Sequence, residues 1–313
     1  MTQGPEGEGL EEAGALGAVP RATAFTPADN PLKGILLLVA AMMIVPFMDG
    51  LAKDLSARYA VSQLVWSRFF FHFAILAPIV LYRYGTAALR PKRPMLQLVR
   101  GGFLLVSTIL FFAAISVMPI ADALALLFIS PMVVTALSNV LLGEKVGVRR
   151  WSAVIVGFAG AMIILRPGFG IVQWGSILAL GAGCTFALYT LSTRKLSGTA
   201  PPLVTLAYTS VLGAAAMSVA VIPEWITPPP GDLAMMVGIG AIAAGGHFLL
   251  IRAFDHAPAS LLAPYSYSEI VMATALGYVW FGDFPDSWTW AGIAVIVASG
   301  IYISSRERRT NTA

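Results

Sequence analysis

Residues 258 to 283 read PASLLAPYSYSEIVMATALGYVWFGD, an apolar run with one acid, Glu269, near its middle. A helix that starts at Pro258 would carry Glu269 about 16 Å inward, close to the centre of a hydrocarbon core about 30 Å thick. A carboxylate at that depth is unfavourable by about 2.5–3.5 kcal/mol on insertion scales. The run therefore predicts a membrane-spanning helix with a functional site at Glu269.

The same pattern occurs once before, 139 residues earlier in the chain. At this offset Pro258 corresponds to Pro119 and Trp290 to Trp151, and the intervening stretches align without a gap. A fixed offset over more than thirty positions is typical of a duplicated unit, so the chain is predicted to contain two related halves.

The whole chain is too apolar for a soluble domain. It is 58% hydrophobic and 12% charged, with a mean hydropathy of +0.79, whereas soluble domains carry about 25% charged residues. Ten apolar segments are long enough, or nearly so, to cross a bilayer. They cover residues 33–52, 61–83, 95–117, 120–142, 150–165, 173–193, 201–222, 232–252, 258–281 and 288–304.

The loop charges orient these segments. With the N-terminus in the cytoplasm, fifteen Lys and Arg residues fall on the cytoplasmic side and three on the outside, and positive loops stay in the cytoplasm. Each half holds five spans, so the second half must insert upside down relative to the first. Inverted repeats of this kind build carriers that work by alternating access, with the substrate site near the bilayer midplane.

The predicted fold is therefore an all-α integral membrane bundle of ten transmembrane helices, arranged as two inverted five-helix repeats around a central cavity. The repeats are expected to cover residues 32–166 and 173–305. Residues 1–31 are predicted to form a disordered cytoplasmic tail because they are polar and lack periodicity, and residues 306–313 are predicted to form a second cytoplasmic tail.

Several classes of site are excluded by what the chain lacks. It has one cysteine, Cys184, and three histidines that lie far apart in the sequence, and it has no P-loop or Rossmann motif. Its basic residues occupy short loops and not one continuous face. We expect no cofactor, no bound metal and no nucleic-acid partner. The expected partners are a small-molecule metabolite and the lipid bilayer, with a homodimer as an option.

Two segments resemble a known family. Residues 141–164, LLGEKVGVRRWSAVIVGFAGAMII, are similar to the end of an EamA domain, and residues 281–292, FGDFPDSWTWAG, are similar to its second copy. The resemblance to the drug/metabolite transporter superfamily covers nearly all of the chain after Lys33. It implies a ten-helix bundle that carries small organic metabolites through a central cavity.

A narrower resemblance concerns the run APYSYSE at 263–269 with FPD at 284–286. These residues are similar to members assigned to S-adenosylmethionine or riboflavin uptake, whereas other members of the family export amino acids or drugs. At the offset of 139, Ser130 stands in the place of Glu269, so the acid is present only in the second half.

Seven side chains are candidates for substrate binding or coupling, and each has a plainer interpretation. Glu269 could instead make a structural hydrogen bond, Arg68 could extend outward to the membrane surface, and His247 follows a run of small residues that suits close helix packing. The candidates are Glu269, Tyr265, Ser268, Ser130, Arg68, His72 and His247.

Helical spacing groups several of these residues. Tyr265 stands one turn before Glu269, and Arg68 stands one turn before His72, so each pair would share a helical face. Asp49 and Lys53 have the same spacing, and we interpret them as a local ion pair.

Four prolines fall inside predicted spans, at 46, 78, 131 and 264. An interior proline removes a helical hydrogen bond and bends the helix. In carriers, interrupted helices line the binding site, and Pro131 and Pro264 stand next to candidate residues.

The leading function is a secondary transporter that moves a small organic metabolite across a bacterial-type inner membrane, with both termini in the cytoplasm. One alternative is an integral membrane enzyme that acts on a lipid or isoprenoid, which usually needs clustered acids for Mg²⁺. The external acids Asp283 and Asp286 are too few for that chemistry. A scaffold protein is disfavoured because an inert bundle has no use for buried ionisable groups. We therefore expect a transporter and not an enzyme.

Overall fold

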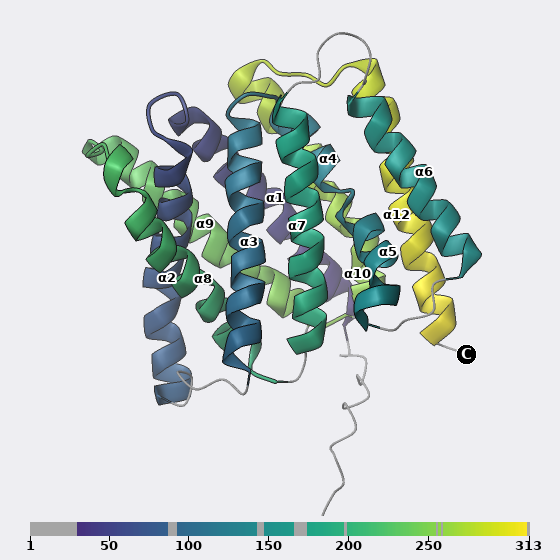
Figure 1. Cartoon of the computed structure of the whole chain (residues 1–313), viewed down its shortest axis with the longest axis horizontal. Helices are drawn as coiled ribbons and strands as arrows, with labels where there is room; N and C mark the ends of the chain where they lie inside the picture. Colours follow the sequence, from purple (N-terminus) through teal and green to yellow (C-terminus); the bar gives the residue numbers. More distant parts are fainter. Residues whose placement is uncertain are drawn as a thin grey trace, which may run out of the picture.

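The computed structural model describes residues 30–86, 93–142, 147–165, 174–196, 199–254, 256–257 and 259–311. Residues 1–29 of the predicted N-terminal tail lie outside this part. The described residues form helices joined by short turns, with no strand among them (Figure 1).

The helices follow the predicted spans closely. Their bounds are α1 Pro31–Leu55, α2 Val61–Tyr84, α3 Pro94–Ile115, α4 Ile120–Leu127, α5 Ser130–Leu142, α6 Val148–Leu165, α7 Trp174–Leu196, α8 Pro202–Ala220, α9 Pro230–Phe254, α10 Ala259–Leu262, α11 Ser268–Leu276 and α12 Ser287–Asn311. The 3-10 helices η3 (Ile222–Glu224) and η4 (Ala263–Tyr267) and the π-helical turn η5 (Gly277–Phe281) complete the described helices.

Ten spans are confirmed when the interrupted helices are joined. Helices α4 and α5 together form the fourth span, and α10, η4, α11 and η5 together form the ninth. Seven helical stretches are long and apolar enough to cross a membrane by themselves, and shorter apolar helices at 151–165 and 287–302 supply two more. Helix α12 ends at Asn311 and not at the predicted position 304.

Local sequence explains where the helices begin and end. The side chain of Asn30 caps α1 by accepting a hydrogen bond from the backbone N–H of Lys33 (3.0 Å), and Pro31 stands at the first helical position. Helices α3, α8 and α9 also begin with proline. Gly282, with φ +73°, ends the ninth span in a left-handed conformation that glycine adopts without strain.

The packing of the helices shows the inverted repeat. If the two halves are exchanged, α1 becomes α7, α3 becomes α9, α2 becomes α8 and α6 becomes α12. The contact of α3 with α7 then becomes the contact of α9 with α1, and the contacts α2–α8 and α6–α12 map onto themselves. These four contacts are the most extensive in the bundle, and Figure 1 shows α6 lying along α12 at one edge. Exchanging the two halves of the chain therefore leaves the set of major helix contacts unchanged.

The same exchange holds at single residues. A Cβ on Gly160 would lie 3.0 Å from the carbonyl oxygen of Gly292, and Ser299 donates its hydroxyl to the carbonyl of Ala153. Adding 139 turns Gly160 into Ser299 and Ala153 into Gly292, so one contact is the pseudo-symmetric copy of the other. Small residues let these backbones approach closely, as is usual where helices pack within membranes.

Both interrupted spans break at equivalent positions. Helix α4 gives way to α5 across residues 128–129, and η4 gives way to α11 across residues 267–268, which is the same place shifted by 139. Pro131 contributes to the first break because it has no N–H to donate to the carbonyl of Leu127. Pro264 lies within the irregular segment of the second, whereas α1 and α2 continue through Pro46 and Pro78.

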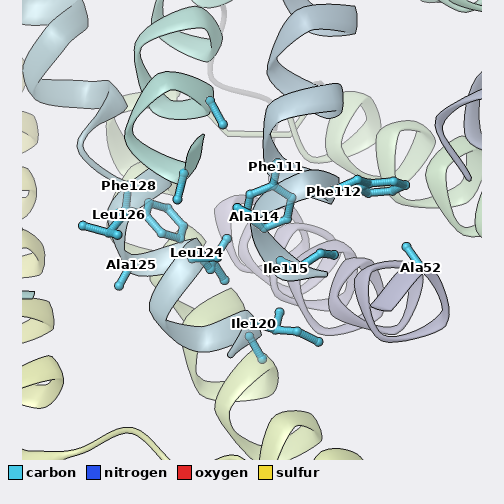
Figure 2. Close-up of a cluster of buried hydrophobic side chains, with 14 of the residues drawn as sticks. Ala52, Phe111, Phe112, Ala114, Ile115, Ile120, Leu124, Ala125, Leu126 and Phe128 are labelled. Carbon is cyan, nitrogen blue, oxygen red and sulfur yellow. The ribbon is translucent and has the colours of Figure 1, made fainter. Parts of the chain in front are cut away.

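The two breaks meet at the pseudo-symmetry axis. The rings of Phe128 and Tyr267, which are equivalent residues of the two halves, lie 5.0 Å apart. A residue that touches its own equivalent must lie beside the axis that relates the halves. The apolar side chains around Phe128 in Figure 2, among them Phe111, Ile115 and Leu124, are buried. Close van der Waals packing of these side chains stabilises the bundle in lipid.

Gly183 of α7 is expected to be sensitive to substitution because it packs against the first break. A Cβ there would lie 2.9 Å from Cγ2 of Ile129 and 3.0 Å from the carbonyl oxygen of Leu127. Gly183→Ala should destabilise the protein by about 1–3 kcal/mol through overpacking, measured as a lower thermal unfolding temperature in detergent. Gly102→Ala is the matched control, since nothing lies within 4 Å of its Cβ position. Equal unfolding temperatures for both variants would contradict this packing.

Candidate functional site

A group of ionisable side chains lies inside the bundle, between the two repeats. Asp49 of α1 interacts electrostatically with Arg68 of α2 and with Glu269 of α11. Helix α1 packs against α11, and α2 packs against α9, which carries His247. Asp49 and His72 are 2% and 4% exposed. We call Asp49, Arg68, His72, His247 and Glu269 the central cluster.

The two histidines of the central cluster stack on each other. The ring centroids of His72 and His247 are 5.7 Å apart, with an angle of 18° between the ring planes. Gly240, two turns before His247 on α9, allows this approach, because a Cβ there would lie 2.8 Å from the backbone nitrogen of His72. The run of small residues therefore serves close packing, and it also brings His247 into the cluster. Nε2 of His72 is buried without a hydrogen-bond partner among the described residues.

Arg68 extends into the bundle and not toward the membrane surface. Its guanidinium group donates a hydrogen bond to Oγ1 of Thr108 on α3, and it lies 5.2 Å from the ring centroid of Phe69. Thr108 itself is buried and donates to the carbonyl of Leu104 (2.8 Å). The side chain of Arg68 therefore does not extend to the membrane surface, as the plainer interpretation would require.

The predicted local ion pair between Asp49 and Lys53 is wrong. Nζ of Lys53 lies 2.7 Å from Oδ2 of Asp283 and 3.1 Å from the carbonyl oxygen of Met118. Lys53 stands near the end of α1, where its long side chain can reach the loop before α12, whereas Asp49 faces the interior. Oδ1 of Asp49 has no hydrogen-bond partner among the described residues. Asp49 thereby joins the central cluster, which the sequence did not predict.

The helical face predicted for Tyr265 and Glu269 does not form, because residues 263–267 are a 3-10 helix and not an α-helix. The hydroxyl of Ser268 donates to the carbonyl of Tyr265 (2.7 Å), and the side chain of Tyr265 is exposed. Tyr267 points inward instead, and its hydroxyl fills the space beside Gly300 of α12. Ser130, the equivalent of Glu269, is buried as the first residue of α5.

Sequence reasoning also missed Arg100 of α3, whose guanidinium group is held by neutral groups of α7 and α8. It donates to the hydroxyls of Thr193 (2.7 Å), Thr209 (2.6 Å) and Tyr189 (2.7 Å) and to the carbonyl of Thr205 (3.2 Å). Arg100 also acts electrostatically on His247, so it belongs beside the central cluster. The one available signal was a cation inside a predicted span.

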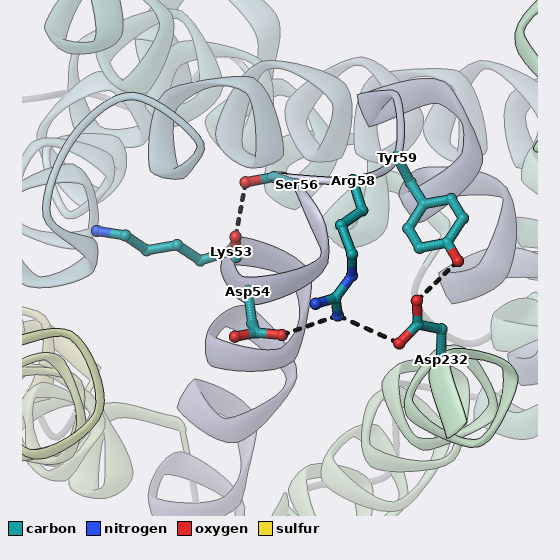
Figure 3. Close-up of polar contacts among 6 residues, drawn as sticks. All are labelled: Lys53, Asp54, Ser56, Arg58, Tyr59 and Asp232. Atoms are coloured by element: carbon teal, nitrogen blue, oxygen red, sulfur yellow. Dashed lines mark hydrogen bonds and ion pairs between the residues drawn. The ribbon is translucent and has the colours of Figure 1, made fainter. Parts of the chain in front are cut away.

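A second polar group ties the repeats together at one end of the bundle, where α1 ends and α9 begins. Figure 3 shows the guanidinium group of Arg58 between Asp54 and Asp232, at 3.2 Å from each, and the hydroxyl of Tyr59 donating to Asp232 at 2.7 Å. The ion pair between Lys53 and Asp283 lies at the same end of α1. We call these contacts the end network. Each of these contacts joins a side chain of the first repeat to a carboxylate of the second repeat. The exception is the ion pair of Arg58 with Asp54, which lies within the first repeat.

The described residues hold no group of three or more His, Cys, Asp or Glu side chains that could bind a metal ion. The polar interior is instead a mixture of acids, guanidinium groups, imidazoles and hydroxyls. Such a mixture can bind a polar organic molecule through charge and hydrogen bonds.

Comparison with known proteins agrees with this description. The EamA-like transporter family matches the chain twice, at residues 32–166 and 173–305. The S-adenosylmethionine uptake transporter of Rickettsia prowazekii (strain Madrid E) is 27% identical over 89% of this chain and 95% of its own length. The riboflavin transporter of Vibrio cholerae serotype O1 is 28% identical over 90% of this chain and 95% of its own.

Two further similarities widen the comparison. The pseudopaline exporter CntI of Pseudomonas aeruginosa (strain UCBPP-PA14) is 28% identical over 88% of this chain and 97% of its own length. A solved crystal structure with 20% identity superposes with a TM-score of 0.63 over 88% of this chain and 98% of its own, which supports the fold. Because the family matches both halves and these relatives are named as transporters and not as enzymes, the chain belongs to the EamA-like transporter family and is a transporter of small metabolites.

Proposed function

We propose that this transporter carries a small metabolite with a cationic group, with S-adenosylmethionine as the first candidate. The observation that supports the proposal is the pair Asp49 and Glu269, two acids from different repeats that act on each other inside the membrane. Two carboxylates in a medium of low dielectric repel each other. Arg68 faces Asp49, whereas Glu269 has no ion pair among the described residues, so a cationic substrate group such as the sulfonium of S-adenosylmethionine would be favoured beside Glu269.

The placement of the acids suits alternating access. Asp49 lies on an unbroken helix of the first repeat, and Glu269 lies in the first turn of α11, directly after the break of the ninth span. Discontinuous helices at the repeat interface commonly hold the substrate near the midplane of such carriers. Rocking of one repeat against the other would then expose the same two acids to each side in turn. Tyr265, Ser268 and Ser130 remain candidate residues of this path, beside the break and at its equivalent.

Counterflow in proteoliposomes tests the substrate. Liposomes loaded with unlabelled S-adenosylmethionine should accumulate the labelled compound from outside, and empty liposomes of the same lipid are the control. Riboflavin and pseudopaline, the compounds named for two other relatives, are measured in parallel. Faster counterflow of riboflavin would overturn the cationic substrate and leave a transporter. Chemical conversion of a compound without its movement would overturn transport itself.

We also propose that the protein lies in a bacterial-type inner membrane with both termini in the cytoplasm, on the basis of the fifteen-to-three distribution of Lys and Arg. Reporter fusions after Thr310 and in the loop at 145 should report the cytoplasm, and a fusion near Pro229 should report the outside. In this orientation the end network lies at the outer surface. Opposite readings at two of the three positions would contradict the orientation.

A further inference from the structure

Arg100 of α3 ties the first repeat to the second through four hydrogen bonds, all of which go to α7 and α8. Three residues earlier on α3, the side-chain amide of Gln97 donates to the hydroxyl of Thr205 on α8 (3.2 Å). These five hydrogen bonds all cross between the repeats. We call the side chains and the carbonyl that make them the buried latch, which comprises Gln97, Arg100, Tyr189, Thr193, Thr205 and Thr209.

The buried latch lies at the end of the bundle opposite the end network. Helix α1 ends at the end network and α2 runs back across the bundle, so α3 begins at the other end, where α7 ends and α8 begins. Figure 1 shows α3 lying along α7. Exchanging the two halves turns the end of α1 and the start of α9 into the end of α7 and the start of α3.

One pair of equivalent residues shows the correspondence directly. Asp54 accepts a hydrogen bond from Arg58 in the end network, and Thr193 accepts one from Arg100 in the buried latch. Thr193 is the equivalent of Asp54 at the offset of 139. The buried latch is therefore the counterpart of the end network under the pseudo-symmetry that relates the repeats.

The two ends differ in burial and charge. The side chains of Arg58 and Asp54 are 49% and 33% exposed, whereas Arg100 and Thr209 are 4% and 1% exposed. Arg100 has no carboxylate oxygen within 4.0 Å among the described residues. A buried guanidinium group held by neutral acceptors has lost its hydration, which water restores only when the helices separate. The closed arrangement therefore depends on each acceptor being in place.

We propose that the buried latch is the gate that closes the substrate path at this end, and that Arg100 positions α3 against α7 and α8 when the path is shut. In the proposed orientation this end faces the cytoplasm. The inference rests on the proposed function, because a carrier that works by alternating access must open at each end in turn. The structure holds the buried latch and the end network together, which is the arrangement of an occluded step between the two open states.

A disulfide across the buried latch tests whether this end must separate. A Cβ on Gly101 of α3 would lie 3.6 Å from Cβ of Leu212 on α8, a separation at which disulfides form. Gly101→Cys with Leu212→Cys, in a chain with Cys184→Ser, should lose counterflow of S-adenosylmethionine on oxidation and recover it on reduction. The reduced form of the same variant is the reference. Undiminished counterflow in the oxidised protein would overturn the gate.

A permanent helix contact would use the same hydrogen bonds, so a second test measures opening itself. Thr193→Val keeps the shape of the side chain and leaves Nε of Arg100 without its acceptor in the closed state, whereas water satisfies Nε in the open state. The open state should therefore gain about tenfold over the closed state. Gly101 is buried, so in Gly101→Cys with Cys184→Ser a small water-soluble thiol reagent should react about tenfold faster once Thr193→Val is added.

Matched variants separate gating from a general loosening of the bundle. Tyr189→Phe removes another acceptor of Arg100 and should also speed the reaction at position 101. Thr190→Val is the control on the same helix, because the hydroxyl of Thr190 donates to the carbonyl of Phe186 within α7 (2.9 Å). It should leave the reaction nearly unchanged. Thermal unfolding shows whether each variant is folded.

A reporter at the other end completes the test. A Cβ on Gly238 of α9 would lie 3.3 Å from Cδ1 of Leu51 on α1, across the repeats near the end network. With Gly238→Cys in place of Gly101→Cys, Thr193→Val should not speed the thiol reaction, because opening at the buried latch does not open this end.

The outcomes distinguish the gate from the proposed function. If Thr193→Val and Tyr189→Phe leave the reaction at position 101 unchanged, or speed it equally at positions 101 and 238, Arg100 makes a permanent contact and the gate is overturned while transport stands. If riboflavin and not S-adenosylmethionine shows counterflow that the disulfide stops, the proposed substrate is wrong and the gate stands. If the unmodified protein moves no compound, the proposed function fails and the gate fails with it.

Discussion

Glu269→Gln should lower the transport of a cationic substrate about 100-fold. Glutamine keeps the shape of the side chain and removes its charge, so the packing of α11 beside α1 is preserved. The loss of one charge-assisted contact in a buried site is worth about 2.8 kcal/mol, which is 100-fold in affinity or rate. The effect is measured as initial counterflow of S-adenosylmethionine at a subsaturating concentration.

A proton gradient separates binding from coupling at Glu269. If Glu269 binds the substrate, uptake driven by a pH gradient and substrate exchange should fall together. If it carries the proton, gradient-driven uptake should disappear and exchange should remain. Glu224→Gln is the control, because Glu224 is exposed and bonds only Ser62 among the contacts shown by the structure. Unchanged rates in both assays would mean that Glu269 has a structural role.

The architecture was predictable because membrane constraints act on whole segments. Span length, loop charge and the offset of 139 each follow from the sequence. The offset reappears in space where Phe128 meets Tyr267 and where the contact of Gly160 with Gly292 is repeated by that of Ser299 with Ala153. The breaks were indicated by Pro131 and Pro264, since an interior proline leaves a carbonyl without its donor. The exact position of each break depends on packing against α7 and α12, which the sequence does not display.

The site was predictable only in part because side-chain reach and local helix type decide which groups meet. A regular α-helix would have placed Tyr265 beside Glu269, but the 3-10 segment turns Tyr267 inward instead. Helical spacing paired Asp49 with Lys53, yet the long side chain of Lys53 reaches another repeat. Arg68, His72 and His247 were identified as ionisable candidates within predicted spans. Their association with Asp49 and Arg100 depends on how α1, α2, α3 and α9 pack together, which the sequence does not show.

Cross-linking positions 53 and 283 should stop transport. Lys53 belongs to the first repeat and Asp283 to the second, and their charged groups are 2.7 Å apart. Alternating access requires the repeats to separate at this end when the site opens toward it. Lys53→Cys with Asp283→Cys, in a chain with Cys184→Ser, can be joined by a short bifunctional thiol reagent that a reductant cleaves. Counterflow should fall to the background of empty liposomes and recover after reduction.

The matched control is a pair at the same end within one repeat. Asp54→Cys with Arg58→Cys places the cross-link inside the first repeat. Because Arg58 also pairs with Asp232 of the second repeat, the uncrosslinked double variant is the reference, and the cross-link itself should leave its counterflow nearly unchanged. Removing the Lys53–Asp283 charges without a cross-link should have a small effect, because a partly exposed ion pair contributes about 0–1 kcal/mol. We expect cross-linking to abolish counterflow and Asp283→Asn to change the counterflow rate by at most about fivefold. This combination would show that transport depends on separation of the repeats and not on the strength of the ion pair. Full counterflow in the cross-linked protein would instead mean that the repeats stay together at this end throughout the cycle.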